Sequence, residues 1–216
     1  MHRERRADSQ RNHDAVLDTA HALFSGPRGV EGVSLADVAA AAGVGKGTVF
    51  RHFGDRAGLM GAVLSRVLEP LRAQLEDTDS PLGPASPPHL RIPAVLDTLL
   101  QVKLRHHRLA LAVESSTGAH PSAGCTDPYR AAPYAWLHRA LEETLRAGRG
   151  GSTAPFTAHV LLGSVRADLL HHLTVERGLA PQEIRDAVRS FALDVLAHTG
   201  TAARPTARPG PRRERN

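Results

Sequence analysis

The stretch SLADVAAAAGVGKGTVFRHF, residues 34–53, decides the fold. Ser34 and Asp37, three positions apart, form a capping-box pattern, which predicts the start of a helix. Small and apolar residues then recur at helical spacing up to Gly43, which is typical of a turn residue with a positive φ. A second short helix fits residues 46–53. Two short helices joined by a glycine-containing turn predict a helix-turn-helix.

The outward face of the second helix carries side chains suited to DNA. Small residues allow the helix to enter a major groove, and cationic side chains donate hydrogen bonds to bases or phosphates. Lys46 and Thr48 are predicted to contact bases, while Gly45 and Gly47 give clearance. The residues predicted to position the DNA backbone are Ser34, Phe50, Arg51, His52 and Arg56.

Two other interpretations of this stretch stay open. One is a solvated polar face in an ordinary helical bundle. The other takes GVGKGT, residues 43–48, as a phosphate-binding loop in an α-helical enzyme that binds a nucleotide. The Walker pattern, however, requires a glycine where Ala40 stands and an apolar strand upstream, and the upstream segment here is alanine-rich and helical in pattern.

Residues 16–59 resemble the N-terminal DNA-binding domain of the TetR family of transcriptional regulators. The matching pieces are VAAAAGV at 38–44 and KGTVFRHF at 46–53, together with Val16, Ala20, Phe24, the Gly32-Val33-Ser34 lead-in and Leu59. This chain departs from the family at three positions, where Gly45 replaces serine, Phe50 replaces tyrosine and Arg56 replaces lysine. The loss of the tyrosine hydroxyl removes one expected phosphate contact.

The resemblance implies an all-α protein of about nine helices, with a three-helix DNA-binding domain and a C-terminal helical domain for ligand binding and dimerisation. It implies a homodimeric regulator, a repressor rather than an enzyme, that binds a two-fold symmetric double-stranded DNA operator and responds to a small-molecule effector. The family buries a closing pair of helices between subunits, although the apolar periodicity here also permits a monomeric core.

The predicted order of helices and domains follows from the amino-acid composition and from the glycine and proline residues that interrupt helices. Leu, Val and Ala supply most of the apolar 41% and aromatic residues only 4%, which favours helices over strands. The domains are predicted as a flexible basic arm (1–11), the helix-turn-helix domain (12–54), a connecting helix (55–76), a ligand-binding and dimerisation domain (77–199) and a disordered Arg/Pro-rich tail (200–216). Helices are expected at 11–25, 56–75, 94–114 with a bend at 106–108, 129–147, 156–177 and 181–198.

The positive charge of the chain is a weak argument for DNA binding. The formal net charge is +5, and five arginines against one glutamate in residues 200–216 account for most of it. Because this charge is concentrated in the tail, a third hypothesis is a helical interaction module whose basic tail binds acidic partners.

The remaining chemistry-bearing residues suggest a ligand cavity rather than catalysis. The single cysteine, Cys125, excludes an internal disulfide, and the adjacent pairs His106-His107 and His171-His172 cannot each face one ion, so no catalytic residue, metal or cofactor is predicted. No apolar run has membrane-span length, and a cytoplasmic location is expected. The candidate ligand-binding residues are His107, Glu114, Tyr134, Trp136, Phe156 and His172.

Overall fold

The computed structural model describes residues 2–116, 129, 131–148 and 151–199. Every regular element within these ranges is helical, so the predicted all-α class is confirmed. The elements are α1 (His2–Ser25), α2 (Leu35–Ala41), α3 (Lys46–Phe53), α4 (Arg56–Glu76), α5 (Pro88–Arg105), α6 (His107–Ser116), α7 (Ala132–Ala147), the 3₁₀ turn η2 (Gly151–Thr153), α8 (Ala154–Gly163), α9 (Ala167–His171), the π-helical turn η3 (His172–Glu176) and α10 (Pro181–Thr199).

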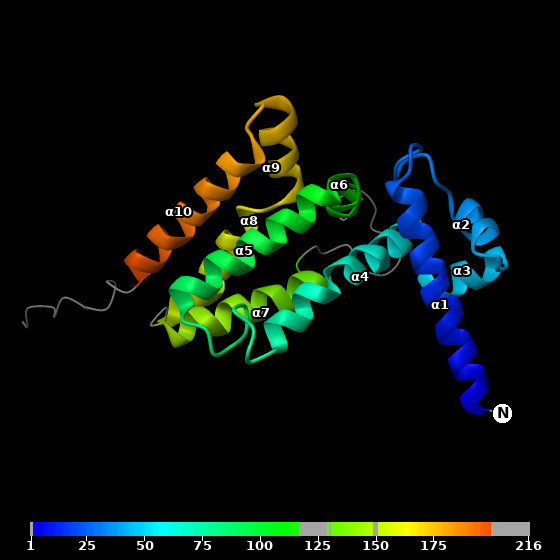
Figure 1. Cartoon of the computed structure of the whole chain (residues 1–216), viewed down its shortest axis with the longest axis horizontal. Helices are drawn as coiled ribbons and strands as arrows, with labels where there is room; N and C mark the ends of the chain where they lie inside the picture. Colours follow the sequence, from blue (N-terminus) through cyan, green and yellow to red (C-terminus); the bar gives the residue numbers. More distant parts are fainter. Residues whose placement is uncertain (1, 117–128, 130, 149–150, 200–216) are drawn as a thin grey trace, which may run out of the picture.

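Helices α1, α2 and α3 form a head at one end of the elongated molecule (Figure 1). Their apolar sides meet the first turns of α4, and α1 packs on both α2 and α4. Val38 and Val49, one on each helix of the predicted helix-turn-helix, are fully buried in this small core. Burial of such side chains contributes about 1.5–3 kcal/mol each, which compensates for the short length of α2 and α3.

Helix α1 differs from its prediction at the N-terminus. It begins at His2 rather than at residue 11, so residues 2–11 are helical and not an irregular arm. The reason is local, because the segment HRERRADSQR has good helix formers and neither glycine nor proline to end the helix. The proposed division of the chain into domains stays a prediction.

Helix α4 joins the head to the rest of the chain. Its buried residues recur at helical spacing along its whole length: Leu59, Met60, Val63, Leu64, Leu68, Leu71 and Leu75. The first turns of α4 contact the head, and the helix then packs on α5, α6 and α7. Pro70 lies inside the helix, which nevertheless continues to Glu76.

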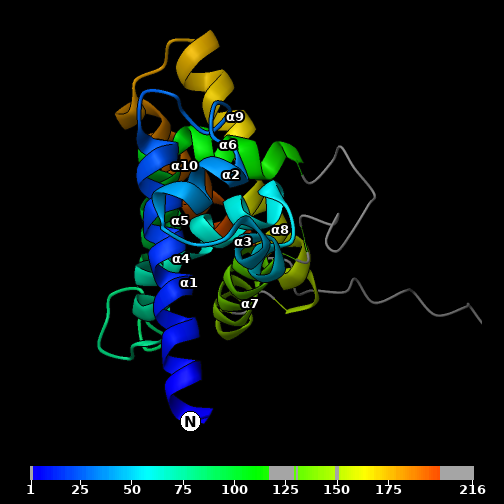
Figure 2. The same ribbon diagram turned by 90° about the vertical axis from the view of Figure 1, so that its right-hand side faces the viewer.

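Helices α5 to α10 form a second bundle around the far half of α4. Helix α10 packs along α5, α7 packs along α8, and α6 lies between α4 and α9. Figure 2, which views the molecule from the side of the head, shows α2 and α3 in front of this bundle. The bend predicted at 106–108 is confirmed, because α5 ends at Arg105 and α6 begins at His107.

Three predicted boundaries in the bundle were wrong. Helix α5 begins at Pro88 rather than at residue 94, since proline is accepted in the first turn, where its missing N–H is not needed. Helix α7 begins at Ala132 rather than at residue 129. The single helix predicted over 156–177 is broken into α8, α9 and η3.

The loop between α4 and α5 is fastened by a buried arginine. Arg91 is 6% exposed, and its guanidinium donates to the carbonyl of Leu82 (2.7 Å), the hydroxyl of Thr144 (2.7 Å) and the carbonyl of Leu75 (3.3 Å). These bonds satisfy polar groups at the end of α4, in the loop and on α7. Burial lowers the pKa of Arg91.

Replacing this arginine tests how much it contributes to stability. Arg91→Met should reduce the free energy of unfolding by about 2–4 kcal/mol, because it leaves buried acceptors without donors. Denaturant titration at fixed protein concentration measures the change. The control is Arg72→Met, at an exposed arginine paired with Glu76 one turn away, which should unfold like the unchanged chain. Equal midpoints for Arg91→Met and Arg72→Met would contradict this assignment.

Candidate nucleic-acid interface and candidate effector cavity

The turn between α2 and α3 is a Schellman motif. Gly43 has a φ of +67°, its N–H donates to the carbonyl of Ala40 (3.3 Å), and the N–H of Val44 donates to the carbonyl of Ala39 (3.0 Å). This pattern satisfies the last carbonyls of α2 and turns the chain sharply into α3. A residue with a Cβ at position 43 would be strained, so this glycine sets the angle between the two helices.

The start of α2 is held by the predicted capping box. The Ser34 hydroxyl accepts from the N–H of Asp37 (3.2 Å), and the Asp37 carboxylate accepts from the N–H of Ser34 (2.8 Å). The hydrogen bond from the Ser34 N–H is the main cause of the lowered pKa of Asp37. The hydroxyl of Ser34 also donates to this carboxylate (2.7 Å), so the side chain is engaged at the helix start.

The outward face of α3 carries the predicted DNA-contacting residues. Gly45, Lys46, Gly47, Arg51 and His52 are exposed. Thr48 is half-buried, and Val49 beside it is completely buried against the head. Lys46 therefore points away from the core, as the helix-turn-helix prediction requires.

Phe50 and Arg56 have different environments. Phe50 is 62% exposed on α3 and presents an aromatic ring to solvent. Arg56 is half-buried and donates to the carbonyls of Val33 (3.0 Å) and Val30, so it fastens the loop before α2 to α4. This structural use of the Arg56 guanidinium was missed by sequence reasoning.

Helix α1 supports α3 through a ring contact. The imidazole of His13 stacks on Phe53 with ring centroids 4.9 Å apart, and its edge meets His52 at 5.8 Å. Arg66 of α4 also contacts Asp14 (2.9 Å) and Asp18 (3.0 Å) of α1. The position of α3 is thus set by α1 and α4 together.

The segment 43–48 does not have the setting of a phosphate-binding loop. A Walker loop follows a strand, whereas Gly43 here follows helix α2. Gly45 is the N-cap residue of α3, and the regular element before this segment is helix α2 rather than a strand.

A cavity of about 240 Å³ lies between the helices of the bundle. Its walls come from α4, α5, α6, α7 and α8 and are mainly apolar: Gly61, Leu64, Leu68, Leu99, Val113, Ala131, Ala132, Pro133, Leu137 and Leu162. The polar lining residues are Ser65, Lys103, Glu114, Tyr129, Tyr134 and Arg166. Desolvation is the main cause that raises the pKa of Tyr134 to about 12, so its hydroxyl stays protonated at neutral pH.

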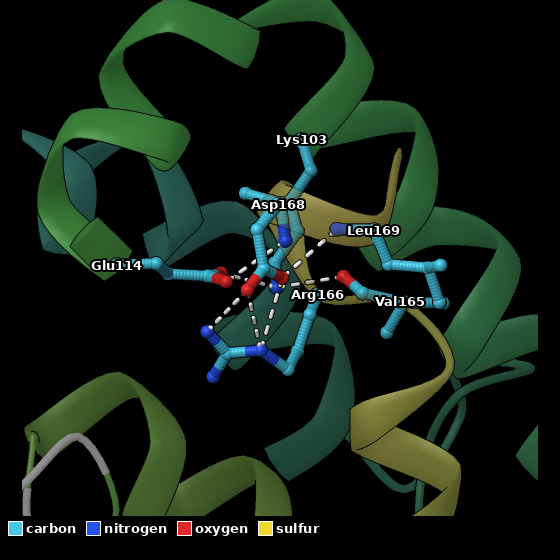
Figure 3. Close-up of polar contacts among 7 residues, drawn as sticks. Lys103, Glu114, Val165, Arg166, Asp168 and Leu169 are labelled. Carbon is cyan, nitrogen blue, oxygen red and sulfur yellow. Dashed lines mark hydrogen bonds and ion pairs between the residues drawn. The ribbon is translucent and has the colours of Figure 1, made fainter. Parts of the chain in front are cut away.

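An ion pair on the cavity wall holds the break between α8 and α9 (Figure 3). Lys103 donates to Glu114 (2.6 Å) and to the carbonyl of Val165 (2.8 Å), and Glu114 accepts from the N–H of Ala167 (2.8 Å). Lys103 and Glu114 thereby satisfy backbone groups on both sides of the break. Arg166, next to the break, pairs with Asp168 (2.8 Å).

Only two of the predicted ligand-binding residues line this cavity, Glu114 and Tyr134. Trp136 is half-buried against the core, and Phe156 is 73% exposed. His107 borders a different hollow near the end of α1, and His172 is exposed and contacts Glu176 at 2.7 Å. Cys125 and the basic tail lie outside the described residues.

Sequence reasoning missed Lys103 and Arg166 as cavity residues. A signal for Lys103 was available, since it follows Leu96 and Leu99 at helical spacing on the apolar face of α5. Arg166 had no such signal, because its place depends on the break that separates α8 from α9.

The fold is that of a helix-turn-helix protein in which one long helix, α4, joins the head to a second helical bundle. Known proteins share this organisation. Residues 16–63 match the family of bacterial regulatory proteins, tetR family. The chain is 30% identical over 110 residues to an HTH-type transcriptional regulator of Staphylococcus aureus strain MRSA252, covering 51% of this chain and 57% of that protein. It is 38% identical over 64 residues to another from strain USA300, covering 30% of this chain and 34% of that protein.

Solved structures resemble the fold over most of the chain. A transcriptional regulator from Rhodococcus sp. RHA1 has a TM-score of 0.63 at 22% identity, with 89% of this chain and 98% of that chain covered. Thermus thermophilus FadR, a TetR family transcriptional repressor solved with lauroyl-CoA, has a TM-score of 0.59 at 19% identity, with 92% and 99% covered. The chain spans a third to three fifths of the length of the two curated relatives. The part of this chain that matches the tetR family is residues 16–63, which include α2, α3 and the first turns of α4.

The Lys103–Glu114 pair yields a prediction about stability. Lys103→Met should lower the free energy of unfolding by about 3 kcal/mol, because it leaves the Glu114 carboxylate little exposed and without its lysine. Adding Glu114→Gln should recover part of this loss, with a coupling of about 0.5–3 kcal/mol in a double-mutant cycle measured by denaturant titration. Strictly additive losses would mean that the two residues do not act together.

Proposed function

We propose that this protein is a transcriptional repressor that binds a specific double-stranded DNA site through α3. The observation that carries the proposal is the outward face of α3, where Lys46, Arg51 and His52 are exposed while Val49 anchors the helix from behind. A helix held in this way can enter a major groove and present donors to base edges and phosphates. No catalytic step is needed for this role, which would be carried out in the cytoplasm.

The two glycines at the start of α3, Gly45 and Gly47, support this proposal. A Cβ added at Gly47 would meet no atom of the protein within 4 Å, and one at Gly45 would only make an ordinary contact with Thr48 at 3.9 Å. Neither glycine has a positive φ. Because neither internal packing nor backbone geometry requires these glycines, clearance for an external partner is the best explanation for them.

A homodimer would place two α3 helices on a two-fold symmetric operator. Exposed apolar side chains on the last helices are suited to bury against a second copy: Phe156 and Val160 on α8, and Phe191 and Leu193 on α10. Two recognition helices would then read half-sites separated by one helical turn, roughly 34–36 Å, or a multiple of it.

The cavity in the bundle is the proposed site of a small-molecule effector. Its apolar walls suit an apolar body, and Lys103, Glu114, Arg166 and Tyr134 offer polar contacts at its edge. The structural neighbour solved with lauroyl-CoA, a molecule with an apolar acyl chain and anionic groups, supports an amphipathic effector. Since α4 forms one wall and also carries the head, a ligand that displaces α4 would change the position of α3.

Selection of bound fragments from random or genomic DNA tests this function directly. We expect the recovered sequences to converge on a two-fold symmetric site. Recovery of fragments without a common sequence, or binding of ATP by calorimetry with no duplex preference, would contradict the proposal.

Substitutions on α3 should separate base contacts from phosphate contacts. Lys46→Ala should weaken binding to the selected site by about 5- to 150-fold, the loss of one specific base contact of about 1–3 kcal/mol. Arg51→Ala should weaken specific and random duplexes alike and reduce the salt slope by about 1. Gel-shift titrations at several salt concentrations measure both effects. Arg72→Ala, on the distant exposed end of α4, is the matched control, and a loss in that variant as large as in Lys46→Ala would remove Lys46 from the interface.

The subunit interface can be tested by introducing charge. Phe156→Glu should convert a dimer to monomers in sedimentation analysis, because a carboxylate buried at the interface lacks a partner. Val175→Glu, at an exposed apolar residue of η3, should leave the dimer intact. If Phe156→Glu sediments as a dimer, α8 is not part of the subunit interface.

A further inference from the structure

The charged side chains at the cavity between the helices form two pairs of opposite sign. Lys103 and Glu114 are 2.6 Å apart, and their side chains are only 12% and 17% exposed. Arg166 donates to Asp168 from Nε (3.0 Å) and from Nη2 (2.8 Å). Figure 3 shows these four side chains gathered at the break between α8 and α9. Each positive charge at the wall is thus matched by a negative charge of the protein itself.

The other polar side chains of the wall are uncharged and already have partners. Burial raises the pKa of Tyr134 to about 12, and its hydroxyl lies 2.5 Å from Nδ1 of His159. Burial also lowers the pKa of His159, so this imidazole is neutral at neutral pH. The hydroxyl of Ser65 donates to the carbonyl of Gly61 (2.9 Å). None of these groups can compensate a charge on a ligand.

An ionised ligand would therefore enter the cavity without a counter-charge. Transfer of an ion to an apolar environment is far more unfavourable than transfer of a neutral polar group. To pair with Lys103, an anion would have to displace Glu114, and breaking a little-exposed ion pair is itself strongly unfavourable. An uncharged ligand avoids both costs, so the wall favours uncharged molecules over ions of the same shape.

Helix α4 leaves space for a ligand at Gly61. This glycine lies on the same face of the helix as Leu64, Ser65 and Leu68, and all four residues line the cavity. A Cβ added at Gly61 would meet no atom within 4 Å, and its φ is not positive. Glycine inside a helix is less favourable than alanine, and neither packing nor backbone geometry requires it here. Room for an external molecule is the best explanation for this residue.

We propose that the cavity selects a small, uncharged, mainly apolar molecule that packs against the backbone of α4 at Gly61. The inference rests on the proposed effector function and narrows the amphipathic effector to an uncharged one. The molecule is small because the cavity, about 240 Å³, lies below the range of about 300–1,000 Å³ in which drug-sized ligands bind. Its apolar body would lie among Gly61, Leu99 and Leu137, and its polar group would make hydrogen bonds rather than an ion pair at the edge.

Two matched pairs of probes test the charge of the ligand. The first pair is 2-naphthylmethanol and 2-naphthoate, and the second is 1-octanol and octanoate, so each pair shares one apolar body and differs in charge. In calorimetric titrations of the full chain at neutral pH, we expect at least one alcohol to bind, and to bind about tenfold or more tightly than its carboxylate. Tighter or equal binding of the carboxylates, or binding of neither alcohol, would overturn the proposal.

Removing a negative charge from the wall should change this preference. Glu114→Gln leaves the positive charge of Lys103 uncompensated, so the affinity for the carboxylate should rise about fivefold or more while that for the alcohol changes little. Asp168→Asn, at the more exposed pair with Arg166, is a second variant that should act in the same direction. If neither variant improves the binding of the carboxylate relative to the alcohol, the paired charges do not select the ligand.

Filling the space at Gly61 tests the place of binding. Gly61→Leu should weaken binding of the alcohol about tenfold or more, and the midpoint of unfolding should stay the same or rise because leucine is a better helix former than glycine. The matched control is Ala73→Leu, at an exposed residue of the same helix, which should bind the alcohol as the parent does. Unchanged binding in Gly61→Leu would overturn the site.

Gel-shift titrations of the same preparations separate this inference from the proposed function. A chain that binds its selected DNA site but prefers the carboxylates would keep the repressor function and overturn the uncharged effector. A chain that prefers the alcohols, and loses them in Gly61→Leu, but binds no specific duplex would support the cavity inference and contradict the repressor function.

Discussion

The uninterrupted apolar stripe of α4 is the constraint on which the rest of the structure depends. Its first turns bury Leu59 and Val63 in the head, and its last turns bury Leu71 and Leu75 in the bundle. Because one helix belongs to both cores, the two parts cannot move apart without exposing apolar surface to water. The stripe therefore keeps head and bundle coupled, and any rotation or tilt of α4 must change the direction in which α3 faces.

The bundle contains the polar contacts that could bias such a movement. Lys103 and Glu114 hold the break between α8 and α9 and also line the cavity that α4 closes on one side. A ligand that competes for Lys103 would disturb both the break and the cavity wall. At the opposite end of α6, His106 contacts His21 of the head. Helix α6 thus runs from the contact between His106 and His21 to the cavity wall, so it is a second physical connection between head and bundle beside α4.

The head was largely predictable because its signals are local. The capping box of Ser34 and Asp37, the positive φ of Gly43 and the buried position of Val49 all follow from neighbours within four residues. The use of Arg56 was not predictable, since its acceptors belong to a loop more than twenty residues away. In the bundle, apolar periodicity located most helices, but it could not reveal that the stretch after Phe156 is broken.

The sequence by itself determined the helical class, the helix-turn-helix and the outward face of α3, because caps, turns and helical periodicity act over a few residues. Only the tertiary structure decided which residues line the cavity, where α8 ends and which histidines meet between the head and the bundle. The physical reason is the separation of the partners along the chain. Lys103 and Glu114 stabilise a backbone break about 50 to 60 residues away, and His21 meets His106 across 85 positions, so these contacts exist only once the helices are packed.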